Sequence, residues 1–213
     1  TIPCEMCIRD SLRDCIRDRN TTPRILIMDN VVSPIGREPN NSYFHYQSHT
    51  TSPKSITSSF VNSSTVYWTN AEIVIRKNGW DLSRNTITSH SGNTLTYTPQ
   101  ASFDWELIDG YGFFIQNHIK TLDISGEWFA DSSTKKISLF SPIDPSKLKI
   151  EISTTEKLID FEWEVSCVTI ENLFLTGANV AAICAENHGH NILIKNNDIQ
   201  YSGETGIMID AHN

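Results

Sequence analysis

The stretch VTIENLFL, residues 168–175, recurs in outline as ILIKNNDI, residues 192–199, which is a shift of 24 positions. The same shift places ICAENH, residues 183–188, over IMIDAH, residues 207–212, without a gap. Moving back by the same interval brings IDFEWE, residues 159–164, into this register. A repeat of this length, with two or three short strands separated by turns and no helical segment, predicts stacked coils of β-structure.

The repeat also predicts which side chains point into the coils. Side chains alternate between the two faces of a strand, so apolar positions shared by successive coils should stack on one another inside. We expect this arrangement of Ile170 on Ile194 and of Ile183 on Ile207. The equivalent Asn172 and Asn196 should lie at a turn, where side-chain amides can form a hydrogen-bonded ladder.

The remaining chain also carries strand signals. Short runs of β-branched and aromatic residues, such as 71–76, 113–116 and 136–140, alternate with segments rich in turn residues, such as 48–64. The sequence therefore predicts an all-β protein. We expect a β-rich module over residues 20–149, followed by incomplete coils over residues 150–213.

These segments resemble a known family. NILIKNNDIQYSGETGIMID, residues 191–210, resembles a coil of a right-handed parallel β-helix of the pectate-lyase-like kind. Residues 68–80, 110–117 and 122–128 resemble segments of secreted bacterial β-helix proteins, chiefly of Bacteroidetes. The stretch GEWF…ISLFSP, within residues 126–142, resembles part of β-helix glycoside hydrolases. The resemblance implies an extracellular or cell-surface protein, with the β-rich module packed on the solenoid or inserted into it.

The N-terminal residues carry a different signal, because CIRD occurs at residues 7–10 and again at 15–18. A zinc site built on the cysteines would need a fourth ligand, and no Cys or His follows until His45. An amphipathic helix is a second interpretation. Residues 6–11 are also what ATG TGT ATA AGA GAC AGY encodes, which resembles a transposon end used in sequencing libraries. We therefore expect residues 1–19 to be a translated adapter that packs poorly, and the chain to be a fragment truncated at both ends.

Acidic residues recur at the interval of the repeat. If positions 161, 185 and 209 point inward, the positions on either side of each should face solvent. On one side lie Asp160, Cys184 and Met208, and on the other lie Glu162, Glu186 and Asp210. The second set would form an acidic ladder with rungs about 4.8 Å apart. Candidate catalytic residues are Glu162, Glu186, Asp210, His188 and His212, and candidate substrate-binding residues are Glu164 and Asn187.

Carboxylates at this spacing repel by roughly 1 kcal/mol even when partly solvated. The repulsion can be relieved by a bound Ca²⁺, by a shared proton, or by full exposure to solvent. A protonated and an ionised carboxyl in one site is the arrangement that glycoside hydrolases use. A solvated acidic face without function is the alternative interpretation. No cofactor is required, and Ca²⁺ is the ion that such a ladder would recruit.

The charge balance bears on the partner. The chain has 17 Lys and Arg against 25 Asp and Glu, a net charge of −8, which disfavours nucleic acid and anionic membranes. No apolar run approaches the roughly 18 residues of a membrane span. The resemblance to secreted β-helix proteins implies a polysaccharide or oligosaccharide as the partner.

Three functional hypotheses follow from the resemblance: a glycoside hydrolase, a non-catalytic glycan-binding, adhesive or spacer protein, and a Ca²⁺-dependent polysaccharide lyase. A lyase would need a basic residue near the acidic ladder, and the visible coils offer Lys195, on another strand set. Hydrolysis is therefore favoured over elimination. Four aromatic residues could stack on sugar rings, although packing in the core is the expectation for them. They are Trp80, Trp105, Tyr111 and Trp128.

Overall fold

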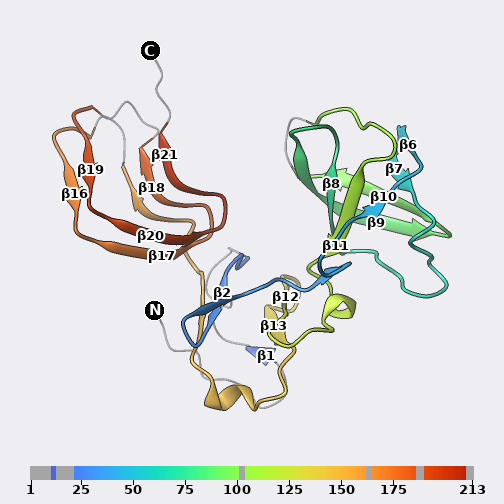
Figure 1. Ribbon diagram of the computed structural model, residues 1–213, viewed down its shortest axis with the longest axis horizontal. Coiled ribbons are helices and arrows are strands. Elements are labelled where there is room, and N and C mark those ends of the chain that lie inside the picture. The colour runs from blue at the N-terminus through green and yellow to red at the C-terminus, as the bar shows by residue number, and fades with distance from the viewer. Residues whose placement is uncertain (1–10, 13–21, 101–103, 162–164, 186–189, 210–213) are drawn as a thin grey trace. The chain divides into compact units, whose positions relative to one another are not determined.

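The computed structural model of the protein describes residues 11–12, 22–100, 104–161, 165–185 and 190–209. These residues form strands joined by turns, together with the 3₁₀ helices η1 (Ile119–Thr121) and η2 (Pro145–Lys147). The prediction of an all-β protein is confirmed. The chain forms two compact units, one of residues 35–129 and one of the residues before and after them (Figure 1). The predicted module of residues 20–149 covers a wider range, and its boundaries stay a prediction.

The C-terminal repeats form three parallel sheets, drawn in orange and red in Figure 1. The pairing follows the interval of the repeat, as in Ile159 with Ile183, Ile183 with Ile207, and Ile170 with Ile194. The predicted pairing of Ile170 with Ile194 and of Ile183 with Ile207 is confirmed. The sheets comprise β15 (Lys157–Asp160), β18 (Ala181–Ala185) and β21 (Thr205–Ile209); β16 (Thr169–Glu171) and β19 (Leu193–Lys195); and β17 (Phe174–Ala178) and β20 (Asp198–Ser202).

Apolar side chains fill the space between these three sheets. Phe161, Ile170, Ile183 and Ala185 are buried together, and partly buried isoleucines and valines pack against them. Because each β-branched residue stacks on a like residue of the next repeat, a single set of inward positions produces a continuous core.

Asparagines shape the turns of the repeats. Asn172 and Asn196 both adopt positive φ, 60° and 53°, a conformation that Asn tolerates better than most residues. Hydrogen bonds between the repeats come from the next residue, Asn197. Its side-chain oxygen accepts from the Leu173 amide (3.0 Å), and its amide nitrogen donates to the Ile170 carbonyl (2.9 Å).

Short antiparallel sheets precede the repeats in the same unit. In the first, β2 lies between β14 and β3, and a tight turn at Asp29 and Asn30, both at positive φ, joins β2 to β3. In the second, β13 lies between β1 and β12. The strands are β1 (Ser11–Leu12), β2 (Leu26–Met28), β3 (Val31–Ser33), β12 (Trp128–Asp131), β13 (Lys136–Leu139) and β14 (Ile150–Ile152).

The proposed adapter, residues 1–19, lies outside the described residues except for β1. There, Ser11 and Leu12 pair with Ser138 and Ile137. The described part of this segment therefore forms one short main-chain pairing with β13, and the poor packing of the rest stays a prediction. The origin of residues 1–19 as a translated adapter also stays a prediction.

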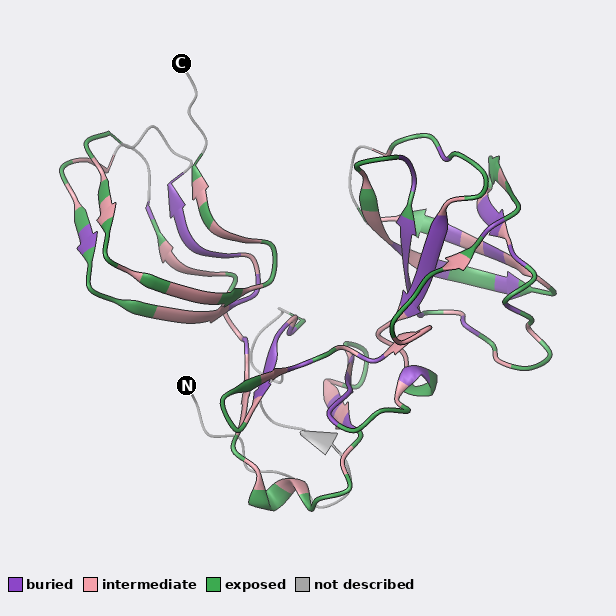
Figure 2. Cartoon of the chain, in the orientation of Figure 1, coloured by how far each residue is buried: buried purple, intermediate pink, exposed green. Residues whose placement is uncertain are grey.

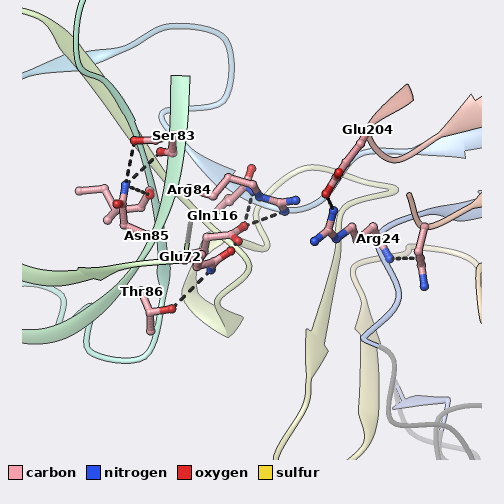
Figure 3. Close-up of polar contacts among 11 residues, drawn as sticks. Arg24, Glu72, Ser83, Arg84, Asn85, Thr86, Gln116 and Glu204 are labelled. Atoms are coloured by element: carbon pink, nitrogen blue, oxygen red, sulfur yellow. Dashed lines mark hydrogen bonds and ion pairs between the residues drawn. The ribbon is translucent and has the colours of Figure 1, made fainter. Parts of the chain in front are cut away.

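A polar cluster ties the β2 segment to the repeats. The Arg24 amide donates to Asn179 Oδ1 (2.9 Å), and the Ile25 amide donates to Ser153 Oγ (3.1 Å). Ser153 Oγ in turn contacts Asn179 Oδ1, and both of these residues are buried. The Arg24 guanidinium also forms an ion pair with Glu204 of the last repeat (Figure 3).

The unit of residues 35–129 contains one antiparallel sheet in the order β4-β11-β8-β9-β10-β7-β6, with β5 paired to β11. One face is buried by a cluster that includes Ile73, Ile75, Leu95, Phe113 and Ile115. The strands are β4 (Arg37–Glu38), β5 (Phe44–His45), β6 (Ser48–Thr51), β7 (Lys54–Thr57), β8 (Glu72–Arg76), β9 (Leu82–Ser91), β10 (Thr94–Pro99) and β11 (Gly112–Gln116).

The register of the repeats predicts unequal costs for two chemically identical substitutions. Ile183 is fully buried between two repeats, whereas its partner Ile207 is 40% exposed. Ile183→Ala should lower the free energy of unfolding by about 2–5 kcal/mol because it leaves a cavity. Ile207→Ala, the matched control, should cost about 1 kcal/mol or less. Urea denaturation followed by circular dichroism measures both, and equal costs would contradict the stacking.

Candidate functional site

The predicted site residues lie outside the described residues. This applies to Glu162, Glu164, Glu186, Asn187, His188, Asp210 and His212. Their assigned roles therefore stay predictions. The described residues that directly precede three of them in the sequence are Phe161, Ala185 and Ile209.

These preceding residues test the predicted alternation of the strand faces. Phe161 and Ala185 are buried in the core of the repeats, as predicted. Ile209 pairs in register with Ala185 but is 67% exposed, because β21 is the edge strand of its sheet in the described chain. Position 209 therefore has the predicted register, but its side chain is not buried.

The prediction for the opposite face is wrong at one position. Asp160, Cys184 and Met208 pair in register, and Asp160 is exposed as predicted. Cys184 is fully buried, together with the rest of β18 (Figure 2). β18 is the middle strand of its sheet, so its small side chains lie between larger residues on both neighbouring strands. The small residues of β18, which are three alanines and Cys184, are therefore buried on both faces, together with Ile183.

The charged residues of the sheet formed by β16 and β19 are paired with each other. Lys195 Nζ lies 2.7 Å from Glu171 Oε2, and their strands β16 and β19 place the two residues side by side. This is the basic residue that the lyase hypothesis would need, and it already neutralises a carboxylate. Among the described residues, no group of three Asp, Glu, His or Cys side chains could hold a metal ion.

The unit of residues 35–129 contains a buried carboxylate that the sequence did not single out. Glu72 on β8 accepts hydrogen bonds from Arg84 Nη2 (3.0 Å) and Gln100 Nε2 (3.0 Å), and also from Gln116 Nε2 (Figure 3). These donors come from β9, from the residue directly after β10 and from β11. Both carboxylate oxygens are engaged, so the cluster holds strands together rather than leaving a reactive group available.

The four candidate sugar-stacking aromatics have different environments. Trp128 is fully buried, and Tyr111 packs against the core with the Arg76 guanidinium 5.5 Å from its ring centroid. Trp80 is 79% exposed and Trp105 is 44% exposed. The expectation of core packing is therefore right for Trp128 and wrong for Trp80 and Trp105.

The two exposed indoles lie together. Their ring centroids are 6.1 Å apart and their planes meet at 87°, an edge-to-face arrangement. Trp80 lies in the turn between β8 and β9, whereas Trp105 lies in the segment after β10. Their separation along the chain carries no sequence signal, so only the fold brings the pair together. We refer to Trp80 and Trp105 as the tryptophan pair.

Buried polar groups hold the backbone beneath the tryptophan pair. The side-chain oxygen of Asn78, a buried residue, accepts from the amides of Trp80 (3.1 Å) and Asp81 (2.8 Å). Fully buried Lys77 forms an ion pair with Asp104, the residue before Trp105. The Ile108 amide donates to the Lys77 carbonyl (3.1 Å). This hydrogen bond holds the segment that contains Trp105 against the turn that contains Trp80.

The environment of Lys77 opposes its charge. The pKa of the Lys77 ammonium is lowered to about 8, chiefly by burial and also by the positive charge of Lys54, while the carboxylate of Asp81 acts against the shift. The contact with Asp104 also favours the charged ammonium. Burial of the Lys77 ammonium costs desolvation free energy, and the ion pair with Asp104 offsets part of it. We infer that this pair fixes the position of Asp104 and of the segment that follows it.

Comparisons with known proteins support the fold. No protein-family model matches the chain, and no curated protein matches it. A solved structure titled "Glycoside hydrolase" is similar, with a TM-score of 0.59 and 15% sequence identity. The match covers 76% of this chain and 32% of that one, so the chain spans about a third of the length of that protein. At this identity the likeness concerns the fold.

No helix among the described residues is long and apolar enough to cross a membrane.

The ion pair beneath the tryptophan pair can be tested by stability. Lys77→Met should lower the free energy of unfolding by about 2–4 kcal/mol, because Asp104 loses its buried partner. Lys77→Met combined with Asp104→Leu should recover part of the loss, since the charge left without its partner, that of Lys54, is partly exposed to solvent. Lys54, which also pairs with Asp104 but is partly exposed, provides the matched control, and Lys54→Met should cost about 1 kcal/mol or less. Equal effects of Lys77→Met and Lys54→Met in urea denaturation would contradict an anchoring role for the buried pair.

Proposed function

We propose that the repeats form a right-handed parallel β-helix and that the protein acts on an extracellular polysaccharide by glycosidic cleavage. The observation that carries this proposal is the parallel pairing of strands at one constant interval in all three sheets. That register extends in the sequence to Glu162, Glu186 and Asp210, which directly follow paired or buried positions. The similar structure titled "Glycoside hydrolase" supports the same class of reaction.

The chemistry assigned to these carboxylates follows from their interval. Neighbouring strands of a sheet lie about 4.8 Å apart, so carboxyls on adjacent repeats would be close to the roughly 5–5.5 Å of retaining glycosidases. Mutual repulsion would keep one of them protonated, and this group would donate a proton to the glycosidic oxygen. The ionised neighbour would attack the anomeric carbon as the nucleophile, and the leaving sugar would depart with the donated proton. His188 and His212 would line the same groove, with Glu164 and Asn187 binding the substrate.

A secreted or cell-surface location in a bacterium belongs to the same proposal. The net charge of −8 favours a glycan over a polyanionic partner. A Ca²⁺-dependent lyase is less favoured, because Lys195 is engaged with Glu171.

A second function, glycan binding without cleavage, is favoured by one observation. The tryptophan pair is exposed on the unit of residues 35–129, away in sequence from any predicted catalytic residue. A glycan-binding or adhesive protein needs such a surface and needs no acid or base.

Substitution of the proposed acid and base tests cleavage. Glu186→Gln and Asp210→Asn should each lower kcat/KM by at least about a hundredfold, because amides neither donate a proton as an acid nor act as a nucleophile. Asp198→Asn is the matched control, since Asp198 is an exposed carboxylate on β20 that bonds to Gln200. Release of reducing ends from a panel of neutral and acidic polysaccharides by the full chain measures the rates.

The outcomes separate the three hypotheses. Turnover that survives both substitutions contradicts the carboxylate mechanism. Unsaturated sugar ends that disappear with a chelator indicate a Ca²⁺-dependent lyase. Polysaccharide binding without any product indicates the non-catalytic function.

A further inference from the structure

We propose that the tryptophan pair, Trp80 and Trp105, is a binding surface for uncharged pyranose units of a polysaccharide. The surface belongs to the unit of residues 35–129 and does not depend on the carboxylates of the repeats. The proposal therefore goes beyond the cleavage proposed above and can fail or succeed separately from it.

The first argument is that exposure of the pair makes the folded protein less stable than burial of the same indoles would. Tryptophan is strongly buried on average, whereas Trp80 is 79% exposed and Trp105 is 44% exposed, so each indole forfeits part of the apolar burial that a core would provide. Two apolar residues close to the pair in the sequence, Leu82 at the start of β9 and Ile108, are also exposed. An exposed apolar patch of this kind marks a binding surface.

The second argument is that the burial of side chains in this turn is the reverse of that in an ordinary surface turn. The polar residues Lys77 and Asn78 are buried, and the indoles point outward. The Arg76 guanidinium donates to the carbonyls of Asn78 (3.3 Å) and Gly79 (3.0 Å) and so fixes the turn further. Ordering this turn before a ligand arrives lowers the entropy cost of binding.

The third argument concerns the chemistry of the ligand. The electron-rich face of an indole attracts weakly positive C–H groups, and a pyranose ring presents such groups on its faces. Edge-to-face indoles offer two ring surfaces in different planes, which suits successive, rotated sugar units. Glu106 is exposed beside Trp105, so its carboxylate provides acceptors for sugar hydroxyls.

The charges around the pair favour an uncharged glycan. The cations are already engaged: Arg76 with carbonyl oxygens, and Lys77 and Lys54 with Asp104. The carboxylates of Asp81 and Glu106 offset them, so a polyanionic chain would gain no attraction here.

The size of the pair argues against a protein partner. A large aromatic side chain buries about 150–250 Å², so two indoles provide a few hundred Å² at most. Stable protein interfaces bury about 1,200–2,000 Å². A stretch of two or three sugar rings matches the smaller area.

Affinity electrophoresis of the full chain tests the proposal. Native gels would contain xylan, galactomannan or mixed-linkage β-glucan as uncharged probes, and polygalacturonate or alginate as anionic probes. We expect at least one uncharged probe to retard the protein. Trp80→Ala and Trp105→Ala should each weaken that interaction by at least about tenfold, because truncating a central aromatic removes most of its contact.

Controls distinguish binding from folding and from cleavage. Tyr67→Ala removes a 57% exposed aromatic of the same unit and should leave retardation unchanged. Trp80→Phe should retain part of the affinity, and the thermal unfolding midpoint of every variant should stay near that of the original chain. Glu186→Gln should bind as the original chain does, whatever its effect on cleavage.

Three results would overturn the proposal. They are an absence of retardation by any uncharged probe, retardation that survives both tryptophan substitutions, and preferential retardation by the anionic probes. A change from dimer to monomer on Trp80→Ala, seen by size-exclusion chromatography, would also overturn it and would assign the surface to contacts between copies of the chain.

Discussion

Parallel pairing at one fixed interval is the constraint on which the C-terminal part of the structure depends. A single repeat cannot bury its apolar residues by itself, because its inward side chains have nothing above or below them. Ile183 is fully buried because a repeat lies on each side of it, whereas Ile207, at the edge, is partly open to solvent. The same register fixes the positions of the turn asparagines and of the hydrogen bonds between repeats. An insertion or deletion that changed the interval would therefore disturb all three sheets.

The segments before the repeats are held to them by polar groups that come from distant parts of the chain. Arg24, Ser153 and Asn179 meet in one cluster, and Arg24 reaches Glu204 through its guanidinium. Buried polar groups are costly unless they are paired, so this cluster specifies one arrangement of the strands. Gly203 is required beside it, because a Cβ at that position would overlap the carbonyl oxygen of Asn179.

Polar groups have a similar role in the unit of residues 35–129. Its sheet buries one face through isoleucine, leucine and phenylalanine, which any amphipathic strand sequence could do. The specific features are the Glu72 cluster, which joins β8, β9 and β11, and the Lys77–Asp104 ion pair, which fixes the turn and the following segment. Such buried charges are weak sources of stability and better sources of a defined local shape. The tryptophan pair is held at the site that this shape defines.

The sequence by itself determined the class of the fold and the stacking of the repeats, because period and alternation are local properties. The shift that aligns Ile170 with Ile194 is visible in the residues, and the backbone pairs them accordingly. Burial depends instead on neighbours that the sequence does not bring together. Only the tertiary structure could decide that Cys184 is enclosed by the strands beside it, that Ile209 is exposed at an edge, and that Trp80 and Trp105 meet in water. The same holds for Glu72, because long-range packing brings its partners on β9, on β11 and directly after β10 to one carboxylate.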